Sequence, residues 1–305
     1  MRSLPMKSLS CLLGLWVGAS VALGQGLPVA ATTGVIADLV REVAGGRVAL
    51  AVVVPMGSDP HSFEPRPSSL RGVARARVLF ANGLYLEPFL PKLEAALPRG
   101  SRTVLLAEGQ PGLICITPEQ RAQEARQGLD VHRHGLCDPH LWLDPGYALA
   151  YARRIHDTLA ALDTAGAPAY AGRLRDFARR LEAVDRAVQE CLAAVPRGRL
   201  RVVVQHDAFQ YAARHYGFQV VGSLAGFAGQ DRGLRNYLEL ARRLEQEQVR
   251  VIISEPQFGE GEVRALAEAS GARVVRLYSD ALTREVPTYL DLLRHNGRAL
   301  CEAFR

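Results

Sequence analysis

The sequence lacks the features that mark several common classes of protein. After residue 24, no segment reaches about 18 consecutive uncharged apolar residues, so we expect no membrane-spanning helix in the mature chain. No basic run carries interleaved aromatic residues, which predicts no nucleic-acid partner. Low-complexity tracts and short repeats are also missing. The sequence therefore indicates a soluble globular protein.

Signatures of common hydrolases are missing as well. The chain has no His-Glu-x-x-His motif, no Gly-x-Ser-x-Gly turn and no Cys-x-x-Cys pair that would hold zinc. What is present is a chain of 305 residues, 48% hydrophobic and 22% charged. That composition supports a sizeable core, and that length suits two domains of ordinary size or one large one.

Residues 1–24 are typical of a secretory signal peptide. Arg2 and Lys7 give a positive start, an apolar stretch of about 15 residues follows, and Ala22 and Gly24 supply the small residues that signal peptidase requires. The stretch is too short for a comfortable membrane span. We expect cleavage and export to the periplasm. The formal net charge of +6 then falls to +4, because the two basic residues are lost.

Four cysteines remain after cleavage, and an even number permits two disulfides in an exported protein. Three pairings are possible, and the sequence leaves the choice open. In one of them, Cys115–Cys137 would brace a loop and Cys191–Cys301 would tie the C-terminal tail to a mid-chain helix. Cys11 lies too early and lacks suitable small neighbours, so we do not interpret it as a lipid-attachment site.

Strand-like and helical segments alternate through both halves of the mature chain. In the first half we predict strands over Val48–Val54, Val78–Ala81 and Thr103–Leu106, and helices over Ser68–Arg75, Glu87–Leu97 and Tyr147–Leu162. In the second half we predict strands over Arg201–Val204, Gln219–Val221, Val249–Ser254 and Val274–Leu277, and helices over Ala208–Tyr216, Asn236–Glu247, Glu262–Ser270 and Thr288–Phe304. This alternation predicts mostly parallel sheets with helices on their faces. The polar residues 115–139 interrupt it as a loop.

A long helix is predicted between the halves, over Ala169–Ala194. Pro168 at its start and Pro196 after its end fit the boundary rules, and at roughly 1.5 Å per residue it would span about 40 Å. The sequence therefore predicts an α/β fold of two lobes, each with a mostly parallel sheet flanked by helices, joined by one long helix. The expected domains are residues 25–167, the linking helix over 168–195, and residues 196–305.

Three histidines and one aspartate lie where ligands are expected. His61, His206 and Asp280 each follow a predicted strand, and His140 lies in a Leu- and Trp-bearing motif. Ligands in open α/β sheets bind beyond the C-terminal ends of strands, so at least three of these side chains should converge between the lobes. Three imidazoles and one carboxylate suit zinc, with bonds of roughly 2.0–2.2 Å, whereas calcium or magnesium would want more oxygen atoms.

The other histidines are interpreted differently. His156, His215 and His295 lie on helical stretches, and we interpret them as surface or core residues. His132 and His134 lie in the loop and are candidates for loose, secondary metal contacts.

Four motifs carry a resemblance to a known family: Asp59-Pro-His61-Ser-Phe-Glu-Pro65, Asp138-Pro-His140-Leu-Trp-Leu-Asp-Pro145, Gln205-His206-Asp207-Ala-Phe209 and Leu277-Tyr-Ser-Asp280-Ala-Leu282. In this order they resemble the metal-binding substrate-binding proteins of bacterial ABC importers for zinc and manganese, the ZnuA/TroA-like cluster A-I family. The resemblance covers nearly all of residues 28–305. It is supported by Ala81-Asn-Gly83 and Ser254-Glu-Pro256.

The resemblance implies that His61, His140, His206 and Asp280 are the metal ligands, in two lobes joined by a rigid helix. It also implies capture of the ion and its delivery to a membrane permease with a cytoplasmic ATPase, without catalysis. We expect a monomer. A glutamate at the third ligand goes with manganese in such families, so His206 favours Zn(II), with Mn(II) as the alternative. The short His-Arg-His loop replaces the long His-rich loop of zinc-dedicated members, which keeps mixed-metal binding open.

Neighbouring carboxylates are candidates to orient the histidines. A ligating imidazole usually donates its other N–H to a carboxylate or carbonyl, which points to Asp59, Asp138, Asp207 and Glu255. The alternative function is a zinc-dependent hydrolase that uses the same three histidines with Asp280 or Glu255 as base. Four protein ligands are typical of a holding site, whereas a catalytic zinc keeps one position open.

Overall fold

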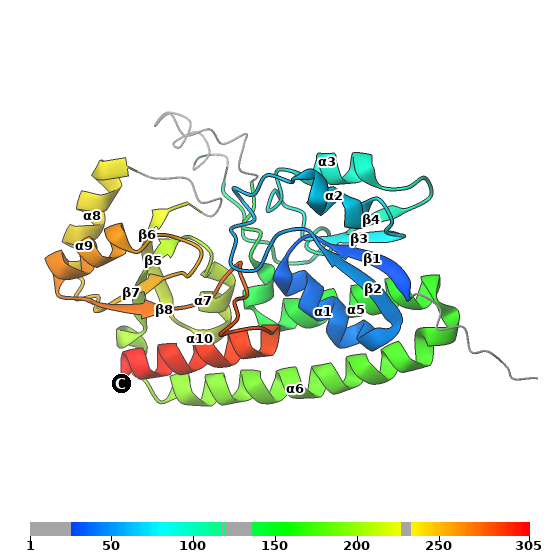
Figure 1. Cartoon of the computed structure of the whole chain (residues 1–305). Coiled ribbons are helices and arrows are strands. Elements are labelled where there is room, and N and C mark those ends of the chain that lie inside the picture. The colour runs from blue at the N-terminus through cyan, green and yellow to red at the C-terminus, as the bar shows by residue number, and fades with distance from the viewer. Residues whose placement is uncertain (1–25, 118, 120–135, 227–232) are drawn as a thin grey trace, which may run out of the picture.

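The computed structural model describes residues 26–117, 119, 136–226 and 233–305. In these residues, two four-stranded parallel sheets lie side by side, helices cover each of them, and one long helix runs along both (Figure 1). No helix in this part of the chain is both long and apolar enough to cross a membrane. The predicted signal peptide over 1–24 lies outside the described residues, as do His132 and His134.

The N-terminal lobe has the strand order β2-β1-β3-β4, with every neighbouring pair parallel. Its strands are β1 (Leu27–Ala31), β2 (Val48–Val52), β3 (Val78–Ala81) and β4 (Arg102–Leu105), and its helices are α1 (Gly34–Ala44), α2 (Pro67–Val73), α3 (Leu90–Ala96) and α5 (Pro145–Leu162). The three predicted strands are present, but β1 and α1 were missed. β1 contains Pro28 and two alanines, which have little intrinsic preference for strands, so its place in the middle of the sheet makes it a strand.

The C-terminal lobe repeats this plan with the strand order β6-β5-β7-β8. Its strands are β5 (Arg201–His206), β6 (Gln219–Ala225), β7 (Val251–Ser254) and β8 (Arg273–Arg276), and its helices are α7 (Gln210–Tyr216), α8 (Gly233–Gln246), α9 (Gly261–Ser270) and α10 (Tyr289–Phe304). All the predicted elements of this half are present, with ends shifted by a few residues. β5 and β7 are buried on both faces, as expected for central strands of a parallel sheet.

The linking helix α6 spans Ala167–Ala193, close to the predicted range. It packs against α1 and α5 of the N-terminal lobe and against α10 of the C-terminal lobe (Figure 1). Its buried residues recur at helical spacing along one face: Tyr170, Phe177, Leu181, Val184, Val188 and Leu192. The predicted fold class is therefore confirmed. The domain bounds at 167/168 and 195/196 stay a prediction.

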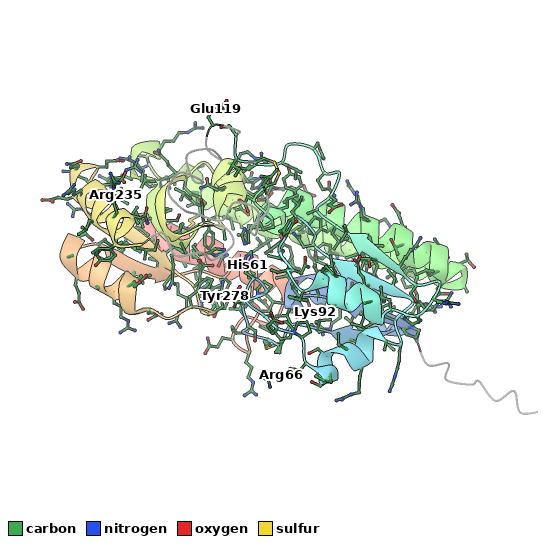
Figure 2. All side chains as sticks on the ribbon, turned by 90° about the horizontal axis from the view of Figure 1, so that it is seen from above. His61, Arg66, Lys92, Glu119, Arg235 and Tyr278 are labelled. Atoms are coloured by element: carbon green, nitrogen blue, oxygen red, sulfur yellow. A yellow bond between two sulfur atoms is a disulfide. The ribbon has the colours of Figure 1, made fainter. Side chains whose placement is uncertain are left out.

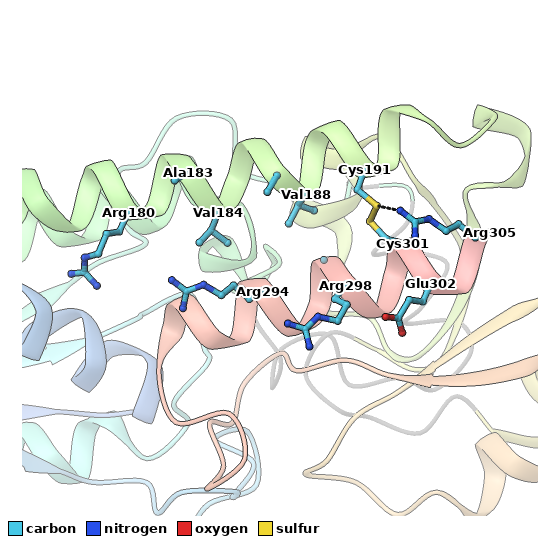
Figure 3. A pocket seen from close by; sticks show the side chains of 12 residues that line it. Arg180, Ala183, Val184, Val188, Cys191, Arg294, Arg298, Cys301, Glu302 and Arg305 are labelled. Atoms are coloured by element: carbon cyan, nitrogen blue, oxygen red, sulfur yellow. Dashed lines mark hydrogen bonds between the residues drawn. A yellow bond between two sulfur atoms is a disulfide. The ribbon is translucent and has the colours of Figure 1, made fainter.

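Two disulfides select one of the three possible pairings. Cys115–Cys137 joins residues 22 apart in the sequence, and Cys191–Cys301 joins residues 110 apart and links α6 to α10. A groove of about 560 Å³ lies beside the second disulfide, between the two helices, and Val184 and Val188 line its α6 side (Figure 3). This is the pairing in which one bridge braces a loop and the other ties down the C-terminal tail.

Candidate metal centre

The sheet topology brings polar residues of both lobes to one place. The strands within each sheet are parallel, so their C-terminal ends share one edge. His206 is the last residue of β5, Asp280 follows β8, and His61 lies in the loop after β2. A backbone hydrogen bond of 2.9 Å from Gly57 N to Leu282 O joins the His61 loop to the Asp280 loop. Figure 2 shows His61 near the middle of the molecule.

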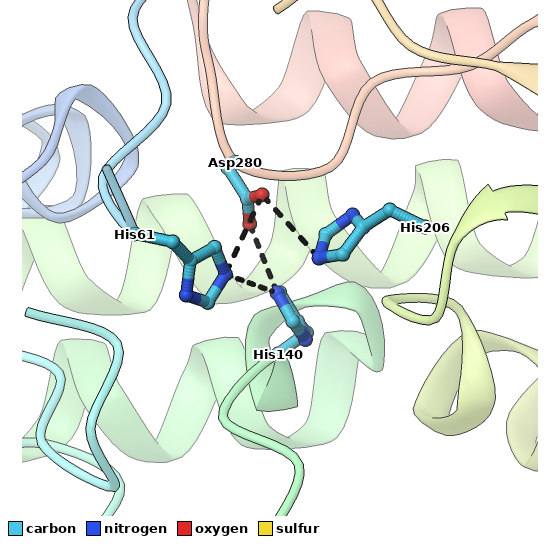
Figure 4. A group of neighbouring side chains, drawn as sticks. All are labelled: His61, His140, His206 and Asp280. Carbon is cyan, nitrogen blue, oxygen red and sulfur yellow. Dashed lines mark hydrogen bonds and ion pairs between the residues drawn. The ribbon is translucent and has the colours of Figure 1, made fainter. Parts of the chain in front are cut away.

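The four predicted site residues converge: His61, His140, His206 and Asp280. One potential ligand atom from each lies within 4.8 Å of the other three (Figure 4). His140 Nε2 is 3.2 Å from both His61 Nε2 and Asp280 Oδ1. The Nε2 atoms of His61 and His206 are each 3.9 Å from Asp280 Oδ2. All four side chains are buried, with an exposed fraction of 3% or less.

Carboxylates hold the other ring nitrogen of two of these histidines. His140 Nδ1 lies 2.7 Å from Asp138 Oδ1, which also accepts the backbone N–H of His140 at 2.9 Å. His206 Nδ1 lies 3.1 Å and 3.3 Å from the two carboxylate oxygens of Glu255. Each carboxylate thereby turns the Nε2 of its histidine towards the common centre. This arrangement is the usual support of a metal-ligating histidine.

Charges within the cluster shift the pKa values of its members. Burial alone would lower the pKa of His140, but Asp280 and Asp138 outweigh it and raise that pKa to about 10. Burial alone would raise the pKa of Asp280, yet the imidazoles, His140 above all, hold it well below its usual range. Burial also opposes charge on His206, whose pKa is nevertheless raised by Glu255 and then by Asp280. A proton on the imidazoles thus supplies the positive charge that the buried carboxylates require.

A divalent cation fits this set of residues. Asp280 Oδ1 is buried and faces His140 Nε2 at 3.2 Å, an ion pair that depends on a proton on that imidazole. A cation at the centre would satisfy this oxygen and replace the proton. Three imidazole nitrogens and a carboxylate oxygen are a donor set typical of zinc, whereas manganese prefers a set richer in oxygen.

Comparison with protein-family models matches residues 29–303 to the family described as zinc-uptake complex component A, periplasmic (ZnuA). The chain belongs to the ZnuA family. Its members are metal-binding proteins outside the cytoplasm that serve ABC importers, so the chain is a substrate-binding protein and not an enzyme. The predicted family is therefore confirmed, and the hydrolase alternative is wrong.

Individual relatives of this ZnuA-family chain bind different metals. The manganese-binding lipoprotein MntA of Halalkalibacterium halodurans is 26% identical over 283 residues, which are 90% of this chain and 87% of MntA. The zinc-binding protein TroA of Treponema pallidum is 29% identical over 290 residues, 92% of this chain and 89% of TroA. The solved structure of TroA matches with a TM-score of 0.78 and 26% identity, and covers 92% of this chain and 99% of that one. Membership of the ZnuA family therefore does not by itself assign the ion.

In this ZnuA-family chain, contacts from the C-terminal lobe hold the segment that precedes α5. Tyr211 of α7 accepts the Ile114 N–H at 3.0 Å and donates to Asp138 O at 3.1 Å. Trp142 Nε1 donates at 2.9 Å to the backbone carbonyl of Ser279, the residue directly before Asp280. The segment that carries His140 is therefore held by residues of both lobes.

Of the four carboxylates predicted to orient the histidines, Asp138 and Glu255 contact an imidazole as described above. Asp59 accepts a backbone N–H from its own loop at 2.9 Å and the Ser62 hydroxyl at 2.6 Å. Asp207 accepts a hydrogen bond from Gln210 at 2.6 Å. These last two carboxylates thus contribute to the shape of the backbone around the centre.

Two polar residues beside the ZnuA-type cluster, Gln257 and Ser279, are not predicted from the sequence. Gln257 Nε2 donates to Glu255 Oε2 at 3.0 Å and to Ser279 Oγ at 2.8 Å. Asp280 Oδ2, at 3.3 Å, is a third and more distant acceptor for the same two N–H groups. Ser279 Oγ in turn donates to Glu255. The only local signal was their position, because one follows Glu255 by two residues and the other precedes Asp280. Polar residues next to a site residue are common, so their contacts had to come from the structure.

Proposed function

We propose that this protein captures one zinc ion in the periplasm and delivers it to the permease of an ABC importer. The proposed ligands are Nε2 of His61, His140 and His206 and a carboxylate oxygen of Asp280. The observation that supports this proposal is the convergence of these four buried side chains within 4.8 Å. Four protein ligands complete a tetrahedral zinc shell, which suits a protein that holds an ion without acting on it chemically.

The preference for zinc over manganese is part of this proposal. It rests on the donor set, because His206 supplies a nitrogen where a carboxylate would suit manganese better. The similarity to the manganese-binding protein MntA makes manganese import the second candidate. The two candidates differ in which ion the metal-free protein binds more tightly.

A competition experiment tests the choice of ion. The metal-free protein is titrated with zinc and manganese against a chromophoric chelator, and the bound metal is counted by elemental analysis. We expect one zinc per chain and a lower dissociation constant for zinc than for manganese. A lower dissociation constant for manganese would overturn the assignment of the ion.

Replacement of a proposed ligand tests the site. His206→Ala should raise the zinc dissociation constant by more than about 100-fold, beyond the 10–100-fold typical of a residue that only supports a ligand. His156→Ala is a matched control, because His156 lies on α5 and bonds the neighbouring Asp157 at 2.9 Å. Equal zinc affinity in the His206 variant and the control would remove His206 from the site.

Export and delivery complete the proposal. Residues 1–24 would be cleaved as a signal peptide, and the mature monomer would dock on a permease that a cytoplasmic ATPase drives. N-terminal sequencing of the exported protein should give a start directly after Gly24. An uncleaved N-terminus on the exported protein would contradict this part of the proposal.

A further inference from the structure

Gln257 connects the supports of two proposed ligands. Its Nε2 donates at 3.0 Å to Glu255, the carboxylate that holds the imidazole of His206. The same nitrogen is a donor at 3.3 Å to Oδ2 of Asp280 and at 2.8 Å to the Ser279 hydroxyl. One side-chain amide therefore contacts both the support of the third ligand and the fourth ligand itself.

The chemistry of its neighbours determines the orientation of this amide. An amide nitrogen carries two N–H donors, so one N–H of Gln257 is shared between two of its three acceptors, and an amide oxygen is only an acceptor. The three oxygen atoms around Gln257 Nε2 belong to Glu255, Ser279 and Asp280. Exchange of the amide oxygen and nitrogen would place the oxygen against two carboxylates, which repel it. The N–H groups therefore face the metal centre.

The two oxygens of Asp280 consequently differ in what they can offer a cation. Oδ1 lies 3.2 Å from Nε2 of His140, which is itself a proposed ligand and gives up its proton when the metal binds. Oδ2 accepts from Gln257. An N–H donor on one oxygen draws electron density from it, which favours binding of the cation through the other oxygen alone. Asp280 is thereby set up as a ligand with one oxygen.

We propose that Gln257 is a specificity-determining residue, whose amide keeps Asp280 monodentate and so holds the site at four ligand atoms. This inference rests on the proposed function, because it assumes that Asp280 is a ligand. Four-coordinate sites with nitrogen donors suit zinc, whereas manganese suits oxygen-rich sites with more ligands. Without the Gln257 donor, Oδ2 becomes free to join the shell as a fifth ligand atom, which favours manganese relative to zinc.

The test removes the N–H donor and measures the ratio of the two affinities. Gln257→Leu and Gln257→Met both lack a donor, and the second also keeps the length of the side chain. Gln189→Leu on α6 is the matched control, because Gln189 is exposed and donates at 3.0 Å to Asp185 of the same helix. Dissociation constants for Zn(II) and Mn(II) are measured by competition. Co(II) is bound separately as a spectroscopic probe, since its visible bands weaken when the coordination number rises above four.

In both Gln257 variants, the Mn(II) dissociation constant divided by the Zn(II) dissociation constant should fall about tenfold or more, as expected for loss of a hydrogen bond to a charged group. The Co(II) bands should weaken in the same variants and stay unchanged in the control. The inference would be overturned if the ratio of the two dissociation constants and the Co(II) bands were both unchanged in the Gln257 variants. This holds whether the two affinities keep their values or fall by the same factor. Failure of the proposed function would look different, because the unmodified protein would then bind no zinc or His206→Ala would bind it normally.

Discussion

The affinity for zinc should rise steeply with pH between 7 and 9. In the metal-free protein the pKa of His140 is raised to about 10, because Asp280 and Asp138 favour its charged form over the effect of burial. Zinc requires the lone pair on Nε2, so binding displaces this proton. At pH 7 the displacement costs about 4 kcal/mol, since each pKa unit corresponds to about 1.36 kcal/mol. The apparent dissociation constant should therefore fall about tenfold for each pH unit up to about 10.

The assay is competition with a chromophoric chelator at pH 6, 7, 8 and 9, corrected for protonation of the chelator itself. Calorimetry in two buffers of different ionisation enthalpy counts the protons released. We expect at least one proton per zinc at pH 7, and more where His206, whose pKa is also raised by Glu255, contributes. Equal affinity at pH 7 and 9 with no proton release would refute this account of the centre.

Substitution of Asp138, which contacts Nδ1 of His140, tests the same reasoning. Asp138→Asn removes one of the two carboxylates that favour the His140 proton, so the rise in affinity should level off at a lower pH. At high pH, loss of the orienting carboxylate should weaken binding by about 10–100-fold. Asp176→Asn on α6 is the control, because Asp176 is half exposed and pairs with Arg179 on the surface. Identical pH profiles in both variants would contradict the role of Asp138.

The raised pKa of His140 also makes the stability of the metal-free protein depend on pH. A raised pKa in the folded state means that His140 stabilises the fold fully below about pH 6.5, its ordinary value. This contribution is lost as the pH rises through about 10. Zinc excludes the proton, so the increase in melting temperature caused by zinc should grow from pH 6 to pH 9.

Three further predictions concern stability. Gly297→Ala should lower the free energy of unfolding, measured in urea, by about 1–3 kcal/mol, because the added Cβ would lie 2.2 Å from Val188 Cγ2. Gly172→Ala on α6 has no neighbour closer than 3.9 Å and should instead raise it by about 0.5–1 kcal/mol. Asp38→Asn should stabilise the protein at pH 8 by up to about 3 kcal/mol, because burial raises the pKa of Asp38 to about 6 even though it accepts the Tyr289 N–H. This gain should vanish below pH 4, where the carboxyl is protonated in both the folded and unfolded states.

Individual elements show how far the sequence predicts this fold. β5 contains three consecutive valines and β7 begins Val-Ile-Ile, and such apolar runs are recognisable because central parallel strands are buried on both faces. β1 was missed because its pairing with β2 and β3, and not its composition, makes it a strand. The helix predicted from Glu87 begins only at Leu90. The Glu87 carboxylate instead accepts the backbone N–H groups of Asn82 and Gly83 and so holds the preceding loop.

The two Asp-Pro-His motifs show the same limit within the site. Asp59 and Asp138 each accept the backbone N–H of the histidine two residues on, at 2.9 Å, as local geometry allows. Asp138 also reaches ring Nδ1 of its histidine at 2.7 Å, whereas Asp59 binds the hydroxyl of Ser62. Only Asp-Pro-His is the same at both places: Ser62 follows the first motif and offers a hydroxyl, whereas Leu141 follows the second and offers none. That Asp138 reaches the imidazole itself had to come from the structure.

The sequence by itself determined the alternation of strands and helices, the long linking helix and three of the converging residues, His61, His206 and Asp280, because each leaves a local pattern of periodicity or of a polar residue after a strand. His140 follows no predicted strand and was identified through the resemblance of its motif to the family. Only the tertiary structure decided how the cysteines pair and which carboxylates reach the histidines. It also decided that Gln257 reaches Asp280. Most of these contacts join residues that are distant in the chain, and no local pattern in the sequence predicts them. They form only when both lobes have packed along α6.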